Sequence, residues 1–244
     1  MPTASRLLIA LFALFLAGCS LTEDQPTDPH KRRPLKVQHA RGETRVPYLS
    51  DRPVTVDPAA LETALALGVK PLGSTSWQRG GRQPAYLRAQ TAGVENLGFA
   101  LTPDVTAVKR LDPDVIIGNN LSQKRYYDQF EEIAATVYSG VPLTEWKADV
   151  RFFGEALGRS DEGERLLIDW DRRVARVKRS LGSSRPDTIT LPADLRRSLD
   201  RAFVDSVLED VGFQAGAAFS HGNGGGIIAA RRILDVVERQ AAVR

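Results

Sequence analysis

The sequence predicts an α/β protein in which a parallel sheet forms an amino-terminal lobe and a long joining helix leads into a smaller carboxyl-terminal region. Five short apolar runs alternate with helical patterns in the first part of the chain, as is typical of a parallel sheet covered by helices. An uninterrupted amphipathic pattern then spans Ser160–Leu181. Beyond it only Thr188–Leu191 has the pattern of a strand, and one strand cannot form a sheet alone. We therefore expect the carboxyl-terminal region to lack a complete sheet.

The central strand of this pattern is Val115–Ile117, a run of β-branched residues without polar alternation. Such a run suits a parallel strand that is covered on both faces. The preceding helix must end before Pro113, because proline lacks an N–H group and disfavours helical geometry in the residue before it. Asn119 and Asn120 follow the strand at its carboxyl end, where open α/β sheets bind their ligands.

The remaining elements follow from capping residues and apolar spacing. Asp57 and Pro58 open a helix that Gly68 ends. The other expected strands are Pro53–Val56, a run ending at Ser74–Trp77, Val94–Gly98 and Thr136–Tyr138. The other expected helices are Thr102–Leu111, Tyr126–Ala135, Trp146–Leu157, Ser198–Val211 and Ile227–Ala242. The strand–helix–strand crossovers should be right-handed.

The amino terminus has the pattern of a lipoprotein signal peptide, expected to span residues 1–18. An apolar run of ten residues, Leu7–Leu16, is too short to span a bilayer and ends in Leu-Ala-Gly-Cys, which looks like a bacterial lipobox. Cleavage there would leave Cys19 as the lipidated residue, anchoring the chain to a membrane on the periplasmic or extracytoplasmic face of the cell envelope. The alternative is a plain secretory signal with an incidental cysteine. Because Cys19 is the only cysteine, no disulfide is expected within the chain.

Residues 19–50 are expected to form a flexible tether, because they are rich in proline and basic residues and lack apolar periodicity. His30 and His39 lie in this segment and are interpreted as solvated side chains rather than metal ligands. The basic face of the helix over Ser160–Leu181 is likewise interpreted as a solvated face, and a net charge of +3 gives no indication of a nucleic-acid partner. The glycine-rich stretch His221–Gly226 lacks a Gly-Lys-Ser/Thr signature and favours a flexible connector over a phosphate loop.

Five segments, taken in order, carry a resemblance to a known family: Ala64–Gly73, Leu111–Ile117, Glu132–Val137 (with Ala135 in place of a proline), Val207–Phe213 and Gly225–Val236. Together they resemble the iron-siderophore and vitamin B12 substrate-binding proteins of ABC transporters. The resemblance implies the class III solute-binding-protein fold, with two α/β lobes, a rigid joining helix and a ligand between the lobes. It also implies a monomer that delivers its ligand to a membrane permease. On this basis the lobes would be 51–158 and 183–244, joined by a helix over 159–182.

Two departures from the family pattern stand out. The family commonly carries a permease-docking glutamate three residues after the proline that here is Pro103, but Thr106 takes that place, and Asp104 would point elsewhere. After Phe213 the family continues with several strand–helix units, whereas here thirteen residues lead to the last helix. The second lobe therefore looks internally shortened, which leaves the apolar faces of its helices to pack on each other or on the joining helix.

Candidate ligand contacts follow the carboxyl ends of the expected strands. Trp77 could stack on a bulky ferric chelate, and Arg79 and Arg82 could donate charge-assisted hydrogen bonds to it. The alternative is a surface loop with one anchoring tryptophan. Asn119 and Asn120 could contact ligand or merely form a turn, and Tyr138 follows the same strand-end logic.

The sequence thus predicts a lipid-anchored substrate-binding protein that captures a ferric siderophore, or a similar iron chelate, for an ABC permease. The alternative is a stand-alone surface lipoprotein that binds a partner or senses a ligand. No Ser-His-Asp or Cys-His set is visible, and three scattered histidines favour neither catalysis nor a zinc site, so we expect no enzyme activity, no cofactor and no resident metal.

Overall fold

The computed structural model describes residues 28, 31–182, 188–214, 216, 218 and 224–242. The expected signal peptide and Cys19 lie outside the described residues. The chain divides into two units, Met1–Arg32 and Arg33–Arg244, and the second carries the helices and strands that follow. Among the described residues, no helix is both long and apolar enough to cross a membrane.

The described residues form a six-stranded sheet in the order β6-β5-β4-β3-β7-β8. Its strands are β3 (Pro53–Thr55), β4 (Gly73–Ser76), β5 (Glu95–Phe99), β6 (Thr102–Pro103), β7 (Val115–Asn119) and β8 (Ala135–Ser139). All neighbours pair in parallel except β6, which pairs antiparallel with β5 at the edge. The parallel sheet predicted from the alternating pattern is therefore confirmed. Because five neighbouring strands run the same way, their carboxyl ends meet at one edge.

Short helices connect the strands; α1 follows its predicted caps, whereas the helix expected over Thr102–Leu111 begins only at Val105, because Thr102 and Pro103 form β6. The helices are α1 (Pro58–Ala66), α2 (Val105–Arg110), α3 (Asn120–Gln123), α4 (Tyr127–Glu131) and α5 (Trp146–Ala156), with 3₁₀ turns η2 (Lys124–Tyr126) and η3 (Leu143–Glu145). Asp57 caps α1 as expected, accepting hydrogen bonds from the backbone N–H groups of Ala59 and Ala60. The helix expected over Tyr126–Ala135 is shorter than predicted, because Ala135 already pairs with Val115 in the sheet.

The expectation of a tether throughout residues 19–50 was wrong for residues 35–46. These residues form an antiparallel hairpin, β1 (Leu35–His39) and β2 (Gly42–Val46). Val37 and Val46 are fully buried in the cluster that contains strands β7 and β8. His39 is half-buried rather than freely solvated: its Nε2 atom lies 2.9 Å from the Thr44 hydroxyl.

The carboxyl-terminal region consists of helices α7 (Ala193–Ser198), α8 (Arg201–Val211) and α9 (Ile227–Ala242). The strand expected at Thr188–Leu191 does not form. Instead, the side-chain amide of Gln240 takes the place of a partner strand, accepting from the Thr190 N–H at 3.2 Å and donating to the Thr190 carbonyl at 2.7 Å. Within the described part of this region, the sole strand-like pairing is an isolated bridge between Leu199 and Gly224. The expectation of an incomplete second sheet agrees with this arrangement.

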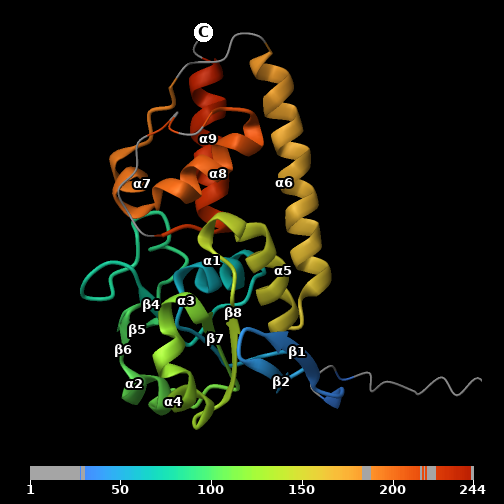
Figure 1. The fold of residues 1–244 in the computed structure, drawn as a ribbon, viewed down its shortest axis with the longest axis vertical. Coiled ribbons are helices and arrows are strands. Elements are labelled where there is room, and N and C mark those ends of the chain that lie inside the picture. Colours follow the sequence, from blue (N-terminus) through green and yellow to red (C-terminus); the bar gives the residue numbers. More distant parts are fainter. Residues whose placement is uncertain are drawn as a thin grey trace, which may run out of the picture. The chain divides into compact units, whose positions relative to one another are not determined.

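The long helix α6 (Ser160–Leu181) matches its predicted bounds, and Figure 1 shows it running alongside α8 and α9. The inward side chains of α6, led by Trp170, join one buried cluster with those of α8 and α9, including Phe203 and Leu234. Trp170 also packs edge-to-face on Trp146 of α5, with ring centroids 5.1 Å apart. The apolar faces of the shortened region are therefore covered by the joining helix and by each other.

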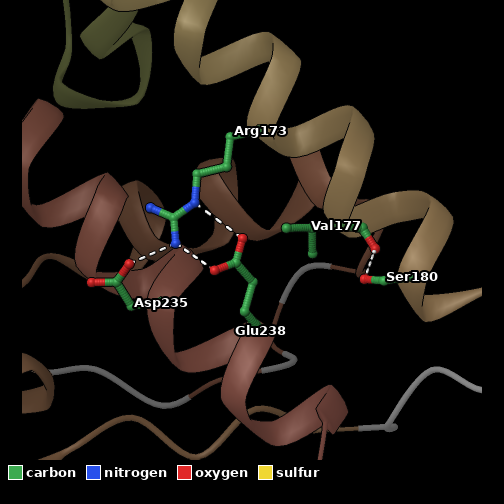
Figure 2. A network of polar contacts seen from close by, with 5 residues as sticks. All are labelled: Arg173, Val177, Ser180, Asp235 and Glu238. Atoms are coloured by element: carbon green, nitrogen blue, oxygen red, sulfur yellow. Dashed lines mark hydrogen bonds and ion pairs between the residues drawn. The ribbon is translucent and has the colours of Figure 1, made fainter.

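Arg173 fastens α6 to α9 from the basic face of α6 (Figure 2). Its Nη2 atom donates to Asp235 and Glu238 at 2.6 Å each, and its Nε atom donates to Glu238 at 3.0 Å. The two carboxylates raise the pKa of the guanidinium above its usual range. The interpretation of the whole basic face as solvated was therefore wrong for Arg173, since spacing alone does not show which cation lies against a neighbouring helix.

The glycines at the start of α9 are packed closely and do not act as a loose connector in their described part, 224–226. A Cβ on Gly225 would lie 2.4 Å from the Phe203 ring, and one on Gly226 would lie 2.9 Å from Glu62. All three glycines are buried. Close approach to Phe203 and Glu62 explains why glycine occupies these positions.

Candidate functional site

A cavity of about 400 Å³ lies at the carboxyl edge of the sheet. The residues after β3, β4, β7 and β8 form one side, and the first turn of α8 forms another. The cavity is lined by Asp57, Ala59, Trp77, Asn119, Leu121, Ser122, Val141, Pro142, Leu143, Thr144, Asp149, Asp200 and Ala202. A cavity of this size suits a small organic ligand.

Three carboxyl groups lie in this lining, each from a different element. Asp57 is the buried cap of α1, and its burial raises its pKa to about 6. Asp149 on α5 is 2% exposed and accepts a short hydrogen bond from the Ser139 hydroxyl through Oδ1. Burial, reinforced by the negative charge of Asp57, raises the pKa of Asp149 to about 8. Asp200 caps α8 by accepting from the Phe203 N–H at 3.0 Å.

Trp77 and Asn119 are the two sequence-predicted residues that line the cavity. The half-buried Trp77 indole packs edge-to-face on Phe99, with centroids 6.0 Å apart, so its orientation is supported from behind. Asn119 holds the turn after β7, where its side chain accepts from the Leu121 N–H and donates to the Val141 carbonyl. Asn119 therefore shapes the rim of the cavity through a structural role.

The other four predicted contact residues do not line the cavity. Arg79 and Arg82 lie exposed on the loop that follows Trp77. Asn120 begins α3, and its Oδ1 atom is buried without a hydrogen-bond partner among the described residues. Tyr138 is fully buried in the core, edge-to-face with Tyr127 at 5.2 Å.

Sequence reasoning missed the three aspartates of the lining, although two of them carried a signal. Asp57 follows β3 after one intervening residue, at the same sheet edge that identified Trp77. Asp149 lies three residues after Trp146 and four before Phe153, on the helix stripe that is otherwise apolar. An acidic residue on a buried stripe needs an explanation, because burying a carboxyl group without a partner is costly. Within the described part of the chain, no group of three or more His, Cys, Asp or Glu side chains is placed to hold a metal ion.

The fold is that of a solute-binding protein, and its sheet has a cavity at the carboxyl edge. A family model described as periplasmic binding protein matches residues 54–214, and the chain belongs to this family. This family consists of substrate-binding proteins rather than enzymes. The resemblance noted in the sequence and the α/β fold class are both confirmed.

The chain is similar to two curated relatives in sequence and to one solved structure in fold. It is 30% identical over 217 residues to the probable siderophore-binding lipoprotein YfiY of Bacillus subtilis, covering 86% of this chain and 67% of the relative. It is 29% identical to the achromobactin-binding periplasmic protein of Dickeya dadantii, covering 68% and 57%. Staphylococcus aureus SirA, solved with staphyloferrin B, shares the fold with a TM-score of 0.63 at 20% identity, covering 86% of this chain and 83% of SirA. The chain spans about two thirds or less of the length of these curated relatives.

Proposed function

We propose that this protein is the substrate-binding component of an ABC importer, and that it captures a ferric siderophore in the cavity at the sheet edge. The observation that carries the proposal is the ligand-sized cavity between the strand ends and the first turn of α8, in a member of the periplasmic binding protein family. The names of the relatives support a siderophore as the class of ligand. The names of these relatives also favour a role in import over the role of a stand-alone surface lipoprotein.

The lining suits a bulky chelate. Trp77 offers an aromatic wall, while Leu121, Val141 and Leu143 add apolar surface. Leu121 is 64% exposed, so this apolar surface extends to the mouth of the cavity, where a ligand would cover it. Burial of that surface against the chelate would contribute to affinity. Arg79 and Arg82, on the exposed loop next to Trp77, would contact the part of a ligand that extends past the wall.

Delivery requires an extracytoplasmic location and a permease. The relatives are named as lipoproteins and periplasmic proteins, which supports a place in the cell envelope. We propose that Cys19 carries the lipid, that the chain works as a monomer, and that residues 51–158 and 183–244 face each other across the ligand. Asp104 caps α2 by accepting from the Ala107 N–H at 2.9 Å, so its carboxylate already has a structural role beside Thr106.

Calorimetric titration of the purified protein with ferric siderophores tests the proposal. We expect saturable binding of at least one chelate, weakened about tenfold or more in Trp77→Ala, since loss of an aromatic wall costs on the order of 1–3 kcal/mol. Tyr126→Ala is the matched control, because Tyr126 is also half-buried but lies outside the lining. Absence of binding to every ferric chelate would refute the proposed function. Equal losses in both variants would move the site away from Trp77.

A further inference from the structure

The loop that follows β4, residues 77–83, is closed at its base and supported from behind. Its first residue, Trp77, lines the cavity. The Ser76 hydroxyl donates to the Arg82 carbonyl at 2.8 Å, so the two ends of the loop are joined by a hydrogen bond. The Trp77 ring packs edge-to-face on Phe99, the last residue of β5. The loop is thus fixed at its base and at the indole.

The tip of the same loop is a tight turn that needs glycine. The Gly81 N–H donates to the Gln78 carbonyl at 3.0 Å, and Gly80, the third residue of the turn, has a φ of +80°. Turns with a positive φ at the third position strongly favour glycine there. Arg79 is the second residue of this turn, so the direction of its side chain depends on how the turn is held.

Asn96 of β5 holds this turn. Its Nδ2 atom donates to the Gly80 carbonyl at 2.8 Å, and its Oδ1 atom accepts from the Gly98 N–H at 2.8 Å. The contact is close, since a Cβ on Gly81 would lie 1.7 Å from the Oδ1 atom of Asn96. Asn96 is exposed, so burial in the core does not explain this contact. The side chain instead joins a strand of the sheet to the loop that carries Trp77.

We infer that Asn96 is a positioning residue of the ligand site: through the Gly80 carbonyl it holds the loop so that Trp77 stays at the cavity and Arg79 stays near it. The inference rests on the proposed function and adds a residue that does not itself line the cavity. A loop that is already ordered loses less conformational freedom when a ligand binds, so more of the interaction energy appears as affinity.

Acrylamide quenching of tryptophan fluorescence tests whether Asn96 fixes Trp77. Trp146 and Trp170 are each 2% exposed, whereas Trp77 is half-buried, so quenching reports mainly on Trp77. Asn96→Ala should raise the quenching constant, because the released loop exposes the indole to solvent more often. This measurement needs no ligand.

Calorimetric titration with ferrichrome, ferric enterobactin and ferric citrate tests the effect on binding. For every probe that binds the wild-type protein, Asn96→Ala should weaken binding about tenfold, since the loop must then be ordered on binding. Gln240→Ala is the matched control, because both ends of the Gln240 amide also bond the backbone, at Thr190, outside the cavity lining. The control should leave quenching and affinity unchanged.

Gly81→Ala perturbs the same contact from the side of the loop. Its Cβ would displace the Asn96 amide and break the bond to Gly80, so this variant should also weaken binding and raise quenching. When Asn96→Ala is already present, no amide remains to be displaced, and adding Gly81→Ala should have a smaller effect than in wild type. The strain of an alanine at a φ of +70° is common to both backgrounds and cancels in the comparison.

The outcomes separate this inference from the proposed function. Unchanged quenching in Asn96→Ala would overturn the inference, as would an unchanged affinity for a probe that binds wild type. Equal changes in Gln240→Ala, or equal effects of Gly81→Ala in both backgrounds, would also overturn it. Each of these results leaves the proposed function intact. If no probe and no other ferric chelate binds, the proposed function fails, and the quenching measurement still decides whether Asn96 holds Trp77 in place.

Discussion

Glu62 links the amino-terminal lobe to the shortened region and should make stability depend on pH. It lies on α1 and is 1% exposed. Its Oε2 atom accepts from the Ala229 N–H in the first turn of α9 at 2.7 Å, and its Oε1 atom accepts from the Tyr86 hydroxyl at 2.8 Å. The pKa of Glu62 is raised to about 7, because burial outweighs these hydrogen bonds.

The sign and size of the effect follow from linkage. In the unfolded chain Glu62 ionises near pH 4.5, whereas in the folded protein its pKa is about 7. Between these values the folded state binds more protons, so stability falls as pH rises from about 4.5 to 7 and stays lowered above that. The difference of 7 minus 4.5, multiplied by ~1.36 kcal/mol for each pH unit, gives a loss of about 3 kcal/mol.

The variant Glu62→Gln should remove this loss. Glutamine does not ionise, and its carbonyl can accept from Ala229 while its amide donates to the Tyr86 oxygen. Urea denaturation at pH 5 and pH 8 measures both proteins, and the stability of the variant relative to wild type should improve by about 2.5 kcal/mol between these values, since part of the change already occurs below pH 5. Asp57, Asp149 and His39 also titrate with shifted pKa values, but they are present in both proteins and largely cancel in the difference. The reasoning would be refuted if the two proteins differed in their free energy of unfolding by the same amount at pH 5 and pH 8. It would also be refuted if wild type became more stable relative to the variant at pH 8.

Three further changes test the packing and the anchor. Gly118→Ala should cost about 1–3 kcal/mol in urea denaturation, since the added Cβ would lie 2.7 Å from Val56 and 2.9 Å from Tyr138; full stability would contradict this. Arg173→Met should cost on the order of 1–3 kcal/mol by leaving two carboxylates of α9 without their donor, and this loss should shrink in high salt. An Arg173→Met variant as stable as wild type would show that these ion pairs contribute nothing. Cys19→Ala should move the protein from the membrane fraction to the soluble fraction, and identical fractionation would rule out a lipid anchor at this residue.

The sheet and the long helix could be predicted because their sequence signals are local and strong. Val115–Ile117 is apolar without alternation, and α6 keeps one apolar face over its whole length, so its bounds agree with the prediction. The hairpin over residues 35–46 could not be predicted in the same way. Only Val37 and Val46 are fully buried there, and polar or basic residues surround them. Its stability depends on packing against strands β7 and β8, which no local pattern reveals.

The strand-end rule located the cavity but did not fix which side chains enter it. Side chains alternate between faces along a strand, so neighbouring strand-end residues point in opposite directions. Tyr138 pairs with Gly118 in the sheet, and its ring fills the space above that glycine in the core. Trp77, which follows β4, lines the cavity, unlike Tyr138. The strand-end rule could not identify Asp149, because this residue lies on helix α5 and does not follow a strand.

The carboxyl-terminal region forms one side of the cavity without a second sheet, because hydrogen bonds and close packing fix the segment that carries Asp200. The start of α8 is fixed where the Asp200 N–H donates to the Gly224 carbonyl at 2.7 Å and the Gly224 N–H donates to the Ser198 carbonyl at 3.0 Å. Two residues further on, Gly226 lies against Glu62, whose carboxyl group holds the first turn of α9. Asp200 is thus hydrogen-bonded to Gly224, and Gly224 lies two residues before Gly226, which packs against Glu62. It follows that Glu62→Gln, which keeps both hydrogen bonds, should leave ligand affinity near that of wild type, whereas Glu62→Ala should weaken binding as well as folding.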